Sequence, residues 1–247
     1  MLNEVRAAFM LLTRLPVARL LPDGGPCDLS RCVWAFPLVG LTVNALGAAV
    51  FGVARYAGVP PLLAACWAFA AIVLATGALH EDGLADTADG FGGGATRERK
   101  LEIMRDSRIG SFGTLALTGA VAVRLAAMAA IGDPWCVAAA LCAGGALGRA
   151  GIAVLLVMLR PARADGLGAA LRDVPAGGAT LAWTIAAAVA LTVLSVGTAL
   201  AAALLAFAAA FALARLARAQ IGGFTGDVLG AAAVFSECVA LTAMAAA

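Results

Sequence analysis

Three aspartates at the end of an apolar stretch are the residues best suited to chemistry. Asp82, Asp86 and Asp89 are spaced i, i+4 and i+7, so they share one face if the helix before them continues past Leu79. Like charges on one stripe repel one another, and the cost is higher beside a membrane. Mg²⁺ would compensate, because it takes oxygen ligands and bridges one or two carboxylates to substrate phosphates. The stripe predicts a magnesium and phosphate site, and a solvated acidic helix end is the alternative.

Basic residues follow this segment. Arg105 and Arg108 are candidates for binding phosphate, because a guanidinium donates two parallel hydrogen bonds to it. The nearby basic residues at positions 97, 99 and 100 are instead interpreted as ordinary cytoplasmic charge. Arg163 and Asp165 lie in a later polar loop and are further candidates.

Charged residues also fall inside the apolar segments. An ionised side chain there needs a partner, so Glu237 is expected to pair with Arg124 or Arg149, and Arg149 is also a candidate for function. The loop 222–227 opens the last apolar segment with Asp227, which is either a helix cap or another metal or substrate ligand. Together these groups indicate metal-assisted phosphoryl transfer.

Long apolar segments must position these residues. The chain has 247 residues, of which 63% are hydrophobic and 13% charged, and its mean hydropathy is +0.97. A membrane-spanning helix needs about 20 mostly apolar residues. We therefore predict an all-α, polytopic transmembrane bundle that forms a single domain over 1–247. The expected seven spans are 33–55, 61–79, 111–131, 135–158, 178–197, 199–214 and 228–246. Residues 1–22 are expected to form an amphipathic or re-entrant piece that ends at Pro16 and Pro22.

The basic residues predict the orientation of these spans. All of them except Arg55, Arg124 and Arg149 fall in segments expected on one side, which places the N-terminus in the cytoplasm. The polar loops 80–110, 159–177 and 215–227 lie on that side, so the site is expected there. The formal net charge of only +2 gives no indication of a nucleic-acid partner. His80 is the single histidine, which excludes a zinc site built on several histidines.

Several motifs resemble one enzyme family along nearly the whole chain. The stretch HEDGLADTADGFGGG, followed by RERKLEIMRDSRIGSFG, looks like the signature of adenosylcobinamide-GDP ribazoletransferase, the cobalamin synthase. Further matches in the same order are LLTRLPV at 11–17, FPLVG at 36–40, PARADGLG at 161–168 and GGFTGDVLGAA at 222–232. Position 81 departs from the family, because it carries Glu where relatives commonly have an apolar residue.

The resemblance implies a multi-pass enzyme of the cell inner membrane that requires Mg²⁺. Its substrates would be adenosylcobinamide-GDP and α-ribazole or its 5′-phosphate, and it would release GMP. A homo-oligomer is compatible with the sequence. The resemblance assigns the metal to Asp82, Asp86 and Asp89, with Glu81 as a fourth acid. It gives His80, Asp106 and Asp227 catalytic roles. The residues expected to bind substrate are Arg14, Arg105, Arg108, Arg149, Arg163, Asp165 and Thr225.

Two other classes of protein fit parts of the pattern. A CDP-alcohol phosphotransferase also carries an acidic helix at the cytoplasmic mouth. However, its motif has Arg after Asp-Gly-x-x-Ala, where this chain has Asp86, and residues 90–102 lack its further aspartates. A transporter would place polar residues near the middle of the membrane. Only Arg124, Arg149 and Glu237 favour that interpretation.

Overall fold

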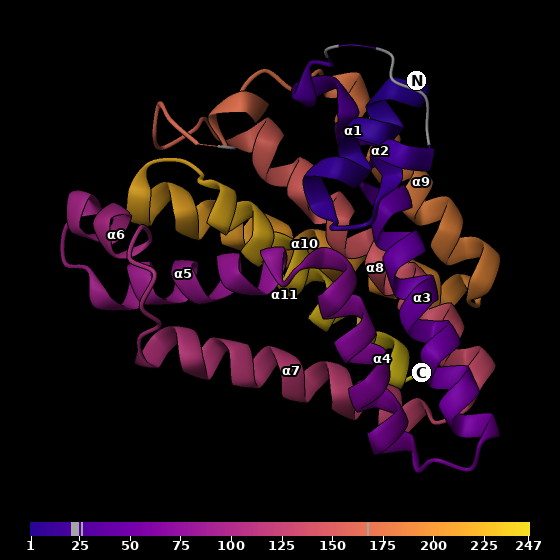
Figure 1. Ribbon diagram of the computed structural model, residues 1–247. Coiled ribbons are helices and arrows are strands. Elements are labelled where there is room, and N and C mark those ends of the chain that lie inside the picture. Colours follow the sequence, from indigo (N-terminus) through magenta and orange to yellow (C-terminus); the bar gives the residue numbers. More distant parts are fainter. Residues whose placement is uncertain (21–24, 26, 167) are drawn as a thin grey trace.

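The computed structural model describes residues 1–20, 25, 27–166 and 168–247, and these residues form an all-α bundle (Figure 1). An isolated β-bridge joins Pro161 to Phe224. The helices, with 3₁₀ segments marked η, are α1 (Leu2–Leu12), α2 (Val17–Leu20), η1 (Leu29–Ala35), α3 (Phe36–Tyr56), α4 (Pro61–Thr76), α5 (Leu79–Gly93), α6 (Arg97–Ile103), α7 (Ser111–Ile131), α8 (Pro134–Met158), η2 (Ala169–Leu171), α9 (Ala176–Val193), α10 (Val196–Ile221) and α11 (Gly226–Ala245).

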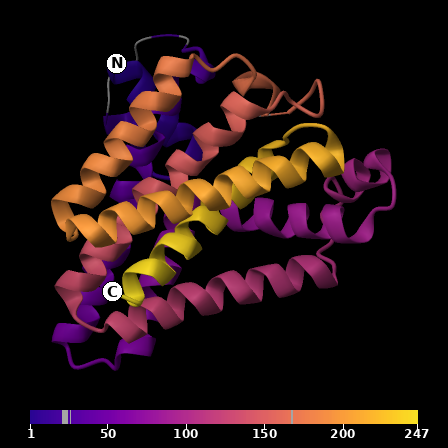
Figure 2. The same ribbon diagram turned by 180° about the vertical axis from the view of Figure 1, so that it is seen from behind.

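The predicted membrane topology agrees with these helices. Six helical segments are long and apolar enough to cross a membrane, and the pair α4 and α5 is a seventh candidate with a bend of 89°. The connections α3–α4, α7–α8 and α9–α10 lie at one end of the bundle, opposite α6 and the connections α8–α9 and α10–α11 (Figures 1 and 2). The basic loops therefore share one side, as predicted. Pro22, an expected end of the N-terminal piece, lies outside the described residues.

Helix α8 is the centre of the bundle. It packs against α3, α9, α10 and α11, and most of its side chains are buried. Small residues allow this close approach, since no hydrophobic force drives helices together in lipid. A Cβ atom on Gly40 of α3 would overlap the carbonyl oxygen of Gly145, and one on Gly148 would lie 2.8 Å from the carbonyl oxygen of Ala233. The absence of these methyl groups determines the distance between the helices.

The structure corrects the prediction for the acidic segment. It is not a straight continuation of the preceding span, because Gly77 and Ala78 both adopt left-handed backbone conformations and turn the chain. Nor is 80–110 mainly a loop. Helix α5 continues through Gly90 and Gly92 and ends at Gly93. Gly90 and Gly92 lie where a Cβ atom would meet the side chains of Met104 and Phe112, so they serve close packing.

The structure also moves the predicted boundaries of two later spans. The boundary expected between the spans 178–197 and 199–214 lies instead at Leu194 and Ser195, because the Ser195 hydroxyl accepts the Thr198 N–H and so begins α10. Helix α10 then extends to Ile221. Residues 215–221 of the expected loop 215–227 are therefore helical.

The glycine contact between α3 and α8 can be tested with a matched pair of variants. Gly40→Ala should lower the free energy of unfolding by about 1–3 kcal/mol, because the methyl group meets a backbone atom that cannot rotate away. Gly52→Ala on the same helix is the control, since no atom lies within 4 Å of its new methyl group. Denaturant unfolding in detergent measures both, and equal stability of the two variants would contradict the packing argument.

Candidate functional site

The site begins where α5 crosses the start of α11. Gly83 makes this crossing close, because a Cβ atom there would lie 2.7 Å from the carbonyl oxygen of Asp227. The crossing brings the first turn of α5, which carries Asp82, beside the first turn of α11. Thr225 begins α11, and its hydroxyl accepts the Val228 N–H.

Three carboxylates gather at this crossing. Asp82 is exposed and Asp86 half-buried, and both lie on the same face of α5. Asp86 is within electrostatic range of Asp82, Asp227 and the Arg163 guanidinium. The described residues include no hydrogen-bond donor to Asp82 or Asp86. Asp227 accepts a hydrogen bond from the Thr225 hydroxyl at 3.0 Å, and its carboxylate lies 3.8 Å from Nη2 of Arg163. Asp82 and Asp86 are thus the two carboxylates of this group that accept no hydrogen bond from the described residues.

The third aspartate of the stripe has another partner. Asp89 is buried, and its two carboxylate oxygens accept the backbone N–H groups of Gly110 at 2.7 Å and Gly113 at 2.8 Å. These amides belong to the first turn of α7, where a negative charge is favourable. Asp89 therefore fastens α7 to α5 in this structure, which the spacing alone did not indicate.

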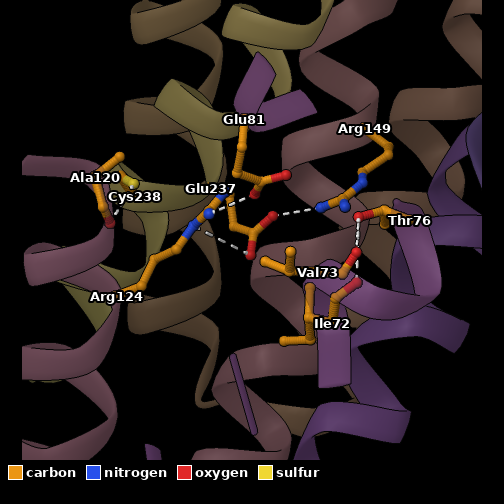
Figure 3. A network of polar contacts seen from close by, with 9 residues as sticks. All are labelled: Ile72, Val73, Thr76, Glu81, Ala120, Arg124, Arg149, Glu237 and Cys238. Atoms are coloured by element: carbon orange, nitrogen blue, oxygen red, sulfur yellow. Dashed lines mark hydrogen bonds and ion pairs between the residues drawn. The ribbon is translucent and has the colours of Figure 1, made fainter. Parts of the chain in front are cut away.

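Glu81 points away from the aspartates into the core. It forms an ion pair at 2.7 Å with Arg124 of α7, which lies 3.8 Å from Glu237 of α11. Glu237 also binds Arg149 of α8. Figure 3 shows these four residues converging from four helices. Both predicted partners of Glu237 are thus present, and Arg149 lies in this buried network and does not line the cavity beside the aspartates. We call these four residues the core ion network.

The predicted ligand set is therefore not gathered in one place. No three His, Cys, Asp or Glu side chains in the described part of the chain are close enough to hold a metal ion together. Glu81 and Asp89 have partners of their own, because α5 presents different faces to the core, to α7 and to α11.

A cavity of about 220 Å³ opens beside Asp82. Its polar lining includes His80, Asp82, Arg163, Asp165 and Asp227. The Nε and Nη2 atoms of Arg163 are buried, and no described residue accepts a hydrogen bond from either. The apolar walls are Leu11, Leu12, Phe36, Leu79, Ile152, Leu171, Phe224 and Leu229. The N-terminal helix thus contributes a wall of the cavity, a role that its amphipathic pattern did not indicate.

The remaining predicted residues lie around this cavity. Thr225 contributes to its lining. Nη2 of Arg105 contacts both oxygens of the Asp165 carboxylate, at 2.9 and 2.7 Å, and so ties the segment after α6 to the loop after α8. The Arg14 guanidinium lies against Gly77 at the bend before α5. Neither Arg14 nor Arg105 lines the cavity.

Asp106 and Arg108 pair with each other outside the cavity. The Arg108 side chain donates to the Asp106 carboxylate, and this hydrogen bond lowers the pKa of Asp106 to about 2. Arg97, interpreted from the sequence only as cytoplasmic charge, donates instead to the carbonyl oxygens of Ile221 and Ala162, each at 2.8 Å. It therefore joins α6 to the end of α10.

The fold and this site define a class, the multi-pass helical membrane proteins with an acidic site at one mouth of the bundle. Residues 4–245 match the model of the family described as cobalamin-5-phosphate synthase. An adenosylcobinamide-GDP ribazoletransferase of Bradyrhizobium diazoefficiens is 46% identical, covering 98% of this chain and 93% of its own. One of Azorhizobium caulinodans is 44% identical, covering 93% and 90%. This chain belongs to the cobalamin-5-phosphate synthase family. No solved structure matches it.

The two kinds of aspartate on α5 should behave differently. Asp89→Asn should lower the free energy of unfolding by about 1–3 kcal/mol, because an amide offers its NH₂ group to one of the two α7 amides. Asp86→Asn, on the same face but without a hydrogen-bond donor among the described residues, should leave stability unchanged. Denaturant unfolding in detergent compares the two. A stable Asp89→Asn protein would mean that the contact with α7 contributes little.

Proposed function

We propose that this chain transfers the adenosylcobinamide-phosphate moiety of adenosylcobinamide-GDP to α-ribazole or α-ribazole 5′-phosphate and releases GMP. The support is membership of the cobalamin-5-phosphate synthase family over residues 4–245 together with the names of its relatives. The carboxylates and Arg163 beside one cavity are the groups that a pyrophosphate substrate requires. The phospholipid phosphotransferase and transporter alternatives find no support among these relatives.

The reaction would be a displacement at phosphorus. An acceptor hydroxyl of the ribazole attacks the phosphorus that carries the cobinamide arm, a new P–O bond forms, and the P–O bond to GMP breaks. Arg163 would neutralise phosphate charge, because it lines the cavity together with Asp82 and Asp227. Asp227, oriented by the Thr225 hydroxyl, would accept the proton of the attacking hydroxyl.

Asp82 and Asp86 would hold Mg²⁺, which would supply charge stabilisation for the transferred phosphoryl group. Their carboxylates fit this role, since they lie together on one face without a hydrogen-bond donor among the described residues. Two carboxylates are sufficient, because Mg²⁺ usually completes its shell with waters and substrate phosphates.

The cavity would receive only part of the substrates. Its volume of about 220 Å³ is below the roughly 300–1,000 Å³ of pockets that enclose drug-sized ligands, so the corrin ring would lie outside it. We further propose that the chain lies in the cell inner membrane with its N-terminus and site on the cytoplasmic side, where basic loops are retained.

The proposal is tested by release of GMP from adenosylcobinamide-GDP in the presence of α-ribazole phosphate and Mg²⁺, with purified protein in lipid nanodiscs. Asp82→Asn should reduce the rate about 100-fold or more, because it removes a charge that binds the metal, and should leave stability unchanged. Chelation of Mg²⁺ should have a similar effect and be reversible.

Asp173→Asn is the matched control. Asp173 is an exposed carboxylate beside Arg160 and Arg172, outside the lining of the cavity, so this variant should keep wild-type activity. Absence of GMP release by the wild-type protein would refute the proposed activity. Full activity of Asp82→Asn would refute the metal assignment alone.

A further inference from the structure

His80 is a buried polar side chain without a partner. It is 2% exposed, and neither ring nitrogen has a hydrogen-bond partner among the described residues. A buried donor or acceptor that lacks a partner destabilises the folded protein. No hydrogen bond or ion pair joins His80 to the core ion network, although the charges of Arg149, Glu81 and Arg124 act on its ring. His80 is one of the residues that line the cavity, so a small movement of its ring would allow an occupant of the cavity to supply the partner.

The cavity is built for an apolar group with few polar atoms. Aliphatic and aromatic side chains from α1, α3, α8, η2 and α11 form most of its lining. Its charged groups, Asp82, Arg163 and Asp227, lie where α5 meets α11. An occupant would therefore place an apolar part among the leucines and phenylalanines and a polar part toward the aspartates.

Among the substrates of the proposed reaction, one part has this character. The guanine of adenosylcobinamide-GDP carries several donors and acceptors, and most would be left unpaired between apolar walls. The benzimidazole of α-ribazole is apolar except for one unsubstituted ring nitrogen, which is an acceptor. An imidazole N–H donates to such a nitrogen in either protonation state.

We propose that this cavity binds the benzimidazole base of the acceptor nucleoside, and that His80 donates a hydrogen bond to its unsubstituted nitrogen. This inference rests on the proposed function. Asp82 lies two residues after His80 on α5, so a base held by His80 would direct its ribose toward Asp82 and Asp227. His80 is thus a positioning residue for the acceptor and discriminates between bases.

The test compares two ligands that differ in one atom. One is α-ribazole, and the other is the matching indole riboside, in which C–H replaces the unsubstituted nitrogen. Equilibrium dialysis against wild-type protein in nanodiscs, without adenosylcobinamide-GDP, should give about tenfold weaker binding of the indole, the loss of one hydrogen bond. His80→Leu should bind both ligands with the lower affinity, so that the discrimination disappears.

Two further variants separate this role from a merely structural one. His80→Gln keeps an N–H donor and should restore part of the discrimination, which also protects the test if His80→Leu fails to fold. Phe36→Leu changes only an apolar wall and should alter the binding of both ligands equally. In the GMP assay, His80→Gln should raise the KM for α-ribazole and leave the KM for adenosylcobinamide-GDP unchanged.

The outcomes distinguish the two proposals. If wild-type protein releases GMP but binds both ligands equally, His80 does not bind the unsubstituted nitrogen and the inference is overturned. The proposed function then still stands. A cavity that holds only water or a lipid chain would give that same result. If α-ribazole is not bound and no GMP is released, both proposals fail.

Discussion

Buried charge pairing determines how the acidic helix sits in the bundle. Glu81, Arg124, Glu237 and Arg149 alternate in sign and come from α5, α7, α11 and α8. Removal of one member of a buried pair typically costs roughly 3–5 kcal/mol, because the other charge is left uncompensated. The network therefore opposes any rotation or withdrawal of α5. Successive residues on a helix point about 100° apart, so with Glu81 in the core, Asp82 faces outward to the cavity.

The other contacts of α5 follow from this anchoring. Asp89 holds the start of α7, and the bend at Gly77 and Ala78 allows α5 to leave the direction of α4 within the same candidate span. The consequence is a short polar helix at the mouth of an apolar bundle, with backbone hydrogen bonds satisfied internally, as a membrane setting requires. The helix is anchored by Glu81 and Asp89, while Asp82 and Asp86 accept no hydrogen bond from the described residues.

Much of this arrangement could be predicted from local patterns. The long apolar runs predicted the spans, and the distribution of basic residues predicted that the polar loops share one side. The spacing of Asp82, Asp86 and Asp89 predicted that they lie on one helix. The division of roles could not be predicted. It depends on which helix each face meets, and such contacts join residues far apart in the chain. The same limit applies to Arg97, whose carbonyl partners lie at 162 and 221, and to Leu11 and Leu12, which become walls of the cavity.

Gly83 determines how closely α5 and α11 approach each other at the site. A Cβ atom at this position would clash with the Asp227 carbonyl oxygen and push α5 and α11 apart. The backbones that carry Asp82 and Asp227 therefore approach as closely as a glycine allows. The spacing of Asp82 and Asp227 is therefore sensitive to the size of the residue at position 83, which carries no ionisable group. Steric control of this kind is invisible to any comparison of ionisable groups alone.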